Sequence, residues 1–500
     1  MTTQHAITVD GAADETLDPQ DWEELRSLGH RMLDDMVDYL RDVRDRPVWQ
    51  APTAAARAVI AGPLPRDPSS AVSVYDDFRD AILPFPTGNI HPRFWGWVMG
   101  TGTPFAMLAD MLASGMNAHV AGYDQAASHV ERQALDWLKE LMGFPQGAGG
   151  LLVGGGTMAN LLGVATARHA LAGFDVRVAG LQGNHPPLVL YASTETHSWV
   201  QKAAELLGIG TVNLRRIAGD ADFRIDPGAL RAAITADRAA GRRPFCVVGT
   251  AGTVNTGATD DLVALRDICD EEGLWLHVDG AFGALAALSP PHRDLVAGVD
   301  RADSLAFDLH KWMYLPFEAG CVLVRDATAQ RAAFSLTPSY LQSVGRGPAA
   351  RPMEFADIGL DLSRGFRALR VWMSLRHHGS DAFGRLIGQN IEQARYLAEL
   401  IHAEPELELL APVAMNVVCF RYVPADGGRN DPDLDALNTE VLLRLQESGV
   451  AVPSSTLIGG RFAIRVAITN HRSRREDFAL LVSEVLAHGR AIDGSVGESA

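Results

Sequence analysis

Ser304-Leu-Ala-Phe-Asp-Leu-His-Lys-Trp-Met313 joins an apolar run, typical of a buried strand, to a lysine. Only three of the chain's 44 lysine and arginine residues are lysines, and we expect the other two, Lys139 and Lys202, to be solvated on amphipathic helices. Lys311 has apolar neighbours, and loss of hydration lowers the pKa of an ammonium group and favours its use as a nucleophile. The alternative is a lysine paired with Asp308 at the end of a strand.

Apolar runs like the one before Lys311 recur along the chain and alternate with segments of helical periodicity. Continuous apolar strands between helices predict an α/β fold with a mostly parallel sheet that is covered on both faces. In such sheets, ligands bind at the C-terminal ends of the strands. The expected strands are residues 187–193, 243–250, 274–279, 304–308 and 320–324.

A chain of 500 residues is predicted to contain a large domain and one or two smaller ones. Residues 1–95 contain a long amphipathic helix after Asp18, and its exposed apolar stripe predicts a segment that packs on a partner subunit. Residues 96–385 are expected to form the large α/β domain. Residues 386–500 are expected to form a small α+β domain, with strands near 414–422 and 461–468 and helices near 432–448 and 475–488.

The composition of the chain argues against several classes of binding partner and structural cross-link. The net charge of −17 argues against nucleic acid and anionic membranes, because phosphate binding needs clustered basic charge. The four cysteines form no Cys-x-x-Cys pair, so we expect buried free thiols and neither a disulfide framework nor a metal site. No signal peptide and no apolar run of membrane-spanning length is present, so the cytoplasm is the expected location.

Three features fall after expected strands, where ligands bind. Gly154-Gly-Gly-Thr157 begins a helix and offers backbone amides to a phosphate, although glycine turns before helices are common. Asp279 ends a strand and needs a cation or a protonated heterocycle as its partner; the alternatives are an N-cap and a structural ion pair. His197 follows another strand and is either a ligand contact or a capping or core histidine.

Together with Lys311, these features match the needs of pyridoxal phosphate. Its phosphate requires a helix N-terminus, and its aldehyde forms a Schiff base with a lysine. Its ring nitrogen must stay protonated to act as an electron sink, which requires a facing carboxylate.

The sequence resembles the group II pyridoxal-phosphate-dependent amino acid decarboxylases, and most closely those that act on aromatic amino acids. The similarity covers roughly residues 90–470 in the order found in that family. The matching motifs are His91-Pro-Arg-Phe, Gly155-Gly-Thr-x-Ala-Asn, Gly252-Thr-x-Asn-Thr-Gly, His277-Val-Asp-Gly-Ala, Asp308-Leu-His-Lys-Trp, Pro338-Ser-Tyr-Leu, Phe366-Arg-Ala-Leu-Arg and Phe462-Ala-Ile-Arg.

This resemblance implies a fold-type I enzyme that acts as a homodimer, with its site at the subunit interface. It implies that Lys311 binds the cofactor, that Asp279 pairs with the ring nitrogen, and that Tyr340 protonates the substrate carbon after carbon dioxide has left. The other residues that it places around the cofactor are Gly156, Thr157, His197, Thr253, Ala281, Asp308 and His310. His119, Val120 and Ala121 are expected to come from the partner subunit.

The expected reaction is α-decarboxylation of an L-amino acid to its amine. Phe94, Trp95, Trp97 and Tyr123 suggest a pocket for an aromatic side chain, although aromatic residues in that stretch can equally belong to the core. The residues expected to line the substrate pocket are Phe94, Trp97, Val98 and His119. Met158, Gly280 and Val254 depart from the family pattern near the cofactor. An aldehyde-forming decarboxylase, another lyase or an aminotransferase on the same scaffold is the alternative, and a binding protein without turnover is a further one.

Overall fold

The computed structural model describes residues 15–336, 345–425 and 429–497. The chain divides into two compact units. The first comprises Met1–Val43 and Ala51–Pro86, and the second comprises Arg44–Gln50 and Thr87–Ala500. In the described part of the chain, no helix is both long and apolar enough to cross a membrane.

The first unit is helical, as its periodicity predicted. Asp21 caps its longest helix by accepting hydrogen bonds from the backbone N–H groups of Glu23 and Glu24. Tyr75 donates a 2.6 Å hydrogen bond to Asp35, which ties the third helix to the first. The unit contains α1 (Trp22–Arg41), α2 (Ala54–Ile60), α3 (Ala71–Asp77) and a π-helical turn at Phe78–Ile82. Apolar side chains that stay exposed on α1 are Trp22, Leu25, Met32 and Val37.

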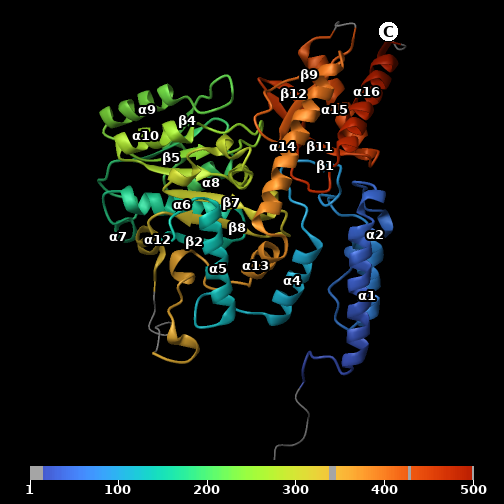
Figure 1. The fold of residues 1–500 in the computed structure, drawn as a ribbon, viewed down its shortest axis with the longest axis horizontal. Helices are drawn as coiled ribbons and strands as arrows, with labels where there is room; N and C mark the ends of the chain where they lie inside the picture. The colour runs from blue at the N-terminus through green and yellow to red at the C-terminus, as the bar shows by residue number, and fades with distance from the viewer. Residues whose placement is uncertain (1–14, 337–344, 426–428, 498–500) are drawn as a thin grey trace, which may run out of the picture. The chain divides into compact units, whose positions relative to one another are not determined.

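The second unit is built on a seven-stranded sheet of order β2-β8-β7-β6-β5-β3-β4 (Figure 1). The five strands β7, β6, β5, β3 and β4 pair in parallel, while β8 is antiparallel to both of its neighbours. The predicted mostly parallel sheet is therefore confirmed. Its strands are β2 (Gly149–Val153), β3 (Leu188–Ser193), β4 (Leu214–Ile217), β5 (Arg243–Thr250), β6 (Trp275–Asp279), β7 (Ser304–Asp308) and β8 (Gly320–Val324).

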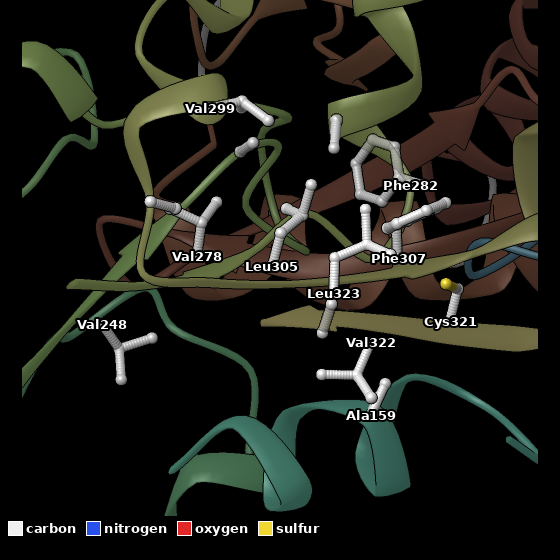
Figure 2. Packing of buried hydrophobic residues seen from close by; sticks show 14 of the residues in the cluster. Ala159, Val248, Val278, Phe282, Val299, Leu305, Phe307, Cys321, Val322 and Leu323 are labelled. Carbon is white, nitrogen blue, oxygen red and sulfur yellow. The ribbon is translucent and has the colours of Figure 1, made fainter. Parts of the chain in front are cut away.

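Helices cover both faces of this sheet, and the core lies in the two layers between. Figure 2 shows Ala159 of α6 against Val322 on one face, with Phe282 and Val299 on the other. The helices are α4 (Pro104–Met116), α5 (Ala126–Leu141), α6 (Gly156–Leu171), α7 (Val176–Ala179), α8 (Trp199–Leu206), α9 (Pro227–Ala239), α10 (Leu262–Glu272), α11 (Leu309–Trp312), α12 (Ala327–Phe334) and α13 (Ala368–His378).

A second sheet, of order β1-β11-β12-β10-β9, forms the C-terminal part of the same unit. Trp95 brings an early segment into it: this side chain is buried, stacks on Phe478 at 4.9 Å and donates to Ser473 at 3.1 Å. The strands are β1 (Phe94–Trp95), β9 (Leu407–Leu409), β10 (Val417–Tyr422), β11 (Val452–Ile458) and β12 (Arg461–Ala467), and the helices are α14 (Ser380–Ala403), α15 (Asp431–Glu447) and α16 (Arg475–Gly497).

One expectation about the lysines is wrong. Lys202 is exposed as predicted, but Lys139 is 8% exposed, on the buried side of α5. Its ammonium group is compensated locally, because it donates to Asp136 at 3.1 Å and to the Gln146 carbonyl at 3.3 Å. The cysteines are buried and unpaired, as expected; they are Cys246, Cys269, Cys321 and Cys419.

Candidate active site

A cavity of about 960 Å³ lies at the C-terminal ends of β5, β6 and β7, beside the first turn of α6. This is the edge where a mostly parallel sheet is expected to bind its ligand. Ten of the residues expected to bind cofactor or substrate line it: Trp97, Val98, Gly156, Thr157, His197, Asp279, Ala281, Asp308, His310 and Lys311.

Other expected residues do not line this cavity. Phe94 is buried beside Val452, in the second sheet. Thr253 is buried in a turn, where its hydroxyl accepts from the Ala258 N–H at 3.1 Å. His119 is exposed. Tyr340, the expected proton donor, lies outside the described residues.

The first turn of α6 is open to an anion. Gly155 precedes the helix with a φ of +152°, and no side chain in the described part of the chain caps the helix there. The free N–H groups and the positive end of the helix dipole therefore face the cavity. Gly156 must be small, because a Cβ atom at this position would lie 2.7 Å from Asp308 Oδ2.

Asp279 is a buried carboxylate, 3% exposed, whose partners are neutral. Its Oδ2 accepts from Trp199 Nε1 at 2.5 Å, and its Oδ1 accepts from the Ala281 N–H at 3.1 Å and from Asn160 Nδ2 at 3.3 Å. Within the described residues it forms no ion pair. A buried carboxylate without a countercharge suits a protonated ring nitrogen.

Lys311 follows β7 in the short helix α11, and its Nζ lies 2.8 Å from Asp308 Oδ2. The ion pair between Lys311 and Asp308, which was the alternative to a reactive lysine, is thus present. Both residues line the cavity, so the pair does not remove Lys311 from the candidate site. Asp308 is 1% exposed, and its Oδ1 has no hydrogen-bond partner among the described residues. Such an orphaned acceptor marks a place where a further donor is missing.

Two histidines of the cavity have lowered pKa values. Partial burial is the main cause for His197, and the nearby Lys311 adds to it. Burial is also the main cause for His310, whose Nδ1 accepts from the Ala319 N–H at 3.2 Å. Both rings are therefore neutral at physiological pH, and His197 accepts from the Trp199 N–H through its own Nδ1.

Sequence reasoning did not assign Asn160, Trp199 and Arg465, all of which line the cavity. Asn160 and Arg465 each end a motif shared with the family, but their positions in the sequence predict no role. Arg465 is 3% exposed and donates to the Trp97 carbonyl at 2.8 Å and to the Asn255 carbonyl at 3.2 Å, and burial lowers its pKa to about 10. It comes from β12 in the second sheet, so only the tertiary fold brings it here.

These observations fit pyridoxal phosphate. The uncapped turn of α6 can hold its phosphate, Asp279 lacks the countercharge that a protonated ring nitrogen supplies, and Lys311 opens onto the same space. The described residues contain no group of three or more His, Cys, Asp or Glu side chains placed to hold a metal ion.

The comparisons with known proteins agree with this chemistry. Residues 55–423 match the family model described as "Pyridoxal-dependent decarboxylase conserved domain". An aromatic-L-amino-acid decarboxylase of Bacillus atrophaeus is 33% identical over 93% of this chain and 95% of its own length. A phenylacetaldehyde synthase of Arabidopsis thaliana is 30% identical over 92% of this chain and 94% of its own length. A crystal structure of Oryza sativa TDC with PLP and tryptamine has a TM-score of 0.87 and 27% identity, covering 95% of this chain and all of that one.

Proposed function

Because this chain belongs to the family of pyridoxal-dependent decarboxylases, we propose that it removes the α-carboxylate of an aromatic L-amino acid and releases the amine. The observation that carries this proposal is the meeting of Lys311, Asp279 and the open turn of α6 in one cavity. The names of the Bacillus and rice relatives support an aromatic substrate. Trp97 supports it as well, because this aromatic residue lines the cavity and is 54% exposed.

In this proposal each residue has a defined task. When bound, pyridoxal phosphate supplies the electron sink that makes loss of carbon dioxide possible. Lys311 holds its aldehyde, and the N–H groups from Gly156 onward hold its phosphate. Asp279 accepts a hydrogen bond from the protonated ring nitrogen and so keeps the proton there. His197, which lines the same cavity, would pack its neutral ring on the cofactor.

The Arabidopsis relative favours a second candidate, an aldehyde-forming decarboxylase. Tyr340 distinguishes the two, since a phenol at this position can donate a proton to the substrate carbon after carbon dioxide has left. The test is a panel of amino acids in which carbon dioxide, amine and aldehyde are all assayed. We expect the wild-type protein to release amine from aromatic substrates and Tyr340→Phe to lose amine output in favour of aldehyde. Unchanged amine release from Tyr340→Phe would leave Tyr340 as a packing residue.

We propose in addition a homodimer in the cytoplasm, with residues 1–95, 96–385 and 386–500 as its three domains. Exposed apolar side chains on α1 and on α4 support association, because large unpartnered apolar surface is uncommon on monomers. On α4 these are Met111, Leu112 and Met116. Val120 and Ala121 are buried within their own chain, so His119 remains the exposed member of the segment expected to reach the partner. Light scattering at micromolar concentration tests the dimer.

A further inference from the structure

A line of hydrogen bonds runs from the core of the large sheet to Asp279. Trp275 Nε1 donates to Ser304 Oγ at 2.8 Å, and Ser304 Oγ lies 2.8 Å from His277 Nδ1. His277 Nε2 lies 2.7 Å from Asn160 Oδ1, and Asn160 Nδ2 donates to Asp279 Oδ1 at 3.3 Å. All five side chains are buried, so their polar atoms must find hydrogen-bond partners within the protein.

One arrangement of protons satisfies the whole line. The amide nitrogen of Asn160 faces two acceptors, Asp279 Oδ1 and the Gly156 carbonyl at 2.8 Å, so its oxygen faces His277. His277 therefore donates through Nε2 and accepts the Ser304 hydroxyl proton through Nδ1. Burial lowers the pKa of His277 to about 4, which keeps the ring neutral and compatible with this arrangement at pH 7.

The packing around His277 holds the line in place. Gly163 of α6 leaves room for the imidazole, since a Cβ atom there would lie 2.5 Å from both Nδ1 and Cε1 of the ring. Asn160 stands on the same helix and bonds to Gly156 in its first turn. The side chain of Asn160 thus bridges the two places that are proposed to anchor the cofactor, the first turn of α6 and the carboxylate at the end of β6.

We propose that Asn160 and His277 are positioning residues, which fix the Asp279 carboxylate relative to the first turn of α6. The inference rests on the role proposed above for Asp279. The ring of the cofactor is rigid and its phosphate is joined to it by a short linker, so the place of the phosphate limits where the ring nitrogen can lie. If the Asp279 carboxylate were free to turn, or if the Asn160 amide presented its oxygen to Asp279, the site would still hold the phosphate but would no longer hold the ring nitrogen.

The test compares two cofactors on the full-length apoenzyme: pyridoxal phosphate and its 1-deaza analogue, in which a C–H group replaces the ring nitrogen. Both carry the same phosphate and aldehyde, so the ratio of their dissociation constants isolates the contact between Asp279 and the nitrogen. Absorbance titration measures both constants. For the wild-type protein we expect pyridoxal phosphate to bind about ten- to a hundredfold more tightly, as for one buried charge-assisted hydrogen bond.

Asn160→Ala and His277→Leu are expected to lower this ratio toward that of Asp279→Ala. His277→Gln is expected to keep most of it, because the glutamine amide nitrogen can take the place of Nε2. Thr166→Val is the matched control: it removes a buried hydroxyl of α6 that donates to the Leu162 carbonyl at 2.8 Å, outside the line, and should keep the wild-type ratio. Ser304→Ala, the mildest deletion, should lower the ratio in part, and it provides a test if the larger changes prevent folding.

The outcomes distinguish a failure of the positioning role of Asn160 and His277 from a failure of the role of Asp279. If Asn160→Ala, His277→Leu or Ser304→Ala weakens both cofactors equally and keeps the wild-type ratio, the line serves packing alone and the inference is overturned. If instead the wild-type protein does not discriminate between the cofactors, or Asp279→Ala discriminates as well as wild type, the role of Asp279 fails, and the proposed function with it.

Discussion

Lys311 Nζ is held 2.8 Å from Asp308 Oδ2, and this ion pair must separate before the amine can react with an aldehyde. The lysine side chain is 23% exposed, so a small molecule can reach it from the cavity. We expect borohydride reduction of the cofactor-loaded protein, followed by peptide mapping, to place the pyridoxyl group on Lys311. The other two lysines are internal controls: Lys139 is buried and Lys202 lies outside the lining of the cavity. A label on either of them would contradict the cofactor assignment.

Asp279→Ala removes the carboxylate proposed to face the ring nitrogen. Losing one member of a buried ion pair costs about 3–5 kcal/mol, and each 1.36 kcal/mol in a barrier is a factor of ten in rate. We therefore expect turnover to fall by roughly two to four orders of magnitude. Asp237→Ala is the matched control, because Asp237 is also buried, pairs with Arg215 at 2.6 Å and lies outside the lining of the cavity. Turnover per folded molecule should survive in that variant, and a normal rate in Asp279→Ala would show that another group faces the nitrogen.

At the scale of elements, a buried ion pair joins α5 to the strand that leads into α6. Glu131 and Arg364 are 0% and 1% exposed and lie 2.5 Å apart. Arg364 also donates to the Leu152 carbonyl of β2 at 2.8 Å and to the Val120 carbonyl at 2.6 Å. The segment that carries Arg364 is therefore tied to α5, to β2 and to the chain at Val120.

Arg364→Met leaves Glu131 buried without a countercharge, and we expect it to lower the free energy of unfolding by about 3–5 kcal/mol. The double variant Glu131→Leu with Arg364→Met should recover much of that loss, because no charge then remains buried. Urea unfolding of the two single variants and the double variant forms a thermodynamic cycle. Additive losses would mean that the two side chains act independently.

The elements that could be predicted are those with a long, regular pattern. The strands before Asp279 and Lys311 and the helix that begins at the glycine turn were all placed to within a few residues. The two-residue strand β1 carries no periodicity, and its partner β11 lies more than 350 residues away in the sequence. Phe94 was therefore expected in the substrate pocket but lies in that sheet.

At the scale of the whole molecule, the candidate site combines residues from Trp97 to Arg465. Lys311, Asp279 and the α6 turn could be inferred because each follows a strand, and parallel strands end at one edge of a sheet. Asn160 and Arg465 could not, because their roles depend on which neighbours the fold supplies: a histidine ring for one and backbone carbonyls for the other.

Acid stability is also a property of the whole molecule. Burial lowers the pKa of His91, His277 and His471 to about 4 each. Between pH 6.5 and 4, the unfolded chain binds protons on these residues that the folded chain does not, so stability falls as the pH falls. Burial raises the pKa of Asp110 and Asp260 to about 6, and these two oppose the trend, because the folded chain binds their protons first. Burial also lowers the pKa of His197, His310 and His378 and raises that of Glu131, so the groups that lose stability outnumber those that gain it and we expect a net loss toward pH 4.

The predicted loss of stability at low pH can be tested on a single residue, His91. It is 1% exposed, its Nδ1 accepts from the Arg93 N–H at 3.0 Å, and an asparagine amide oxygen can replace that acceptor. A shift from 6.5 to about 4 corresponds to about 3 kcal/mol at 1.36 kcal/mol per unit. Relative to wild type, His91→Asn should therefore gain up to about 3 kcal/mol as the pH falls from 7 to 4, whatever its stability at pH 7. Urea unfolding at several pH values measures this difference, with His30→Asn on the exposed surface of α1 as the control. A constant difference between His91→Asn and wild type across that range would show that His91 takes up its proton equally in both states.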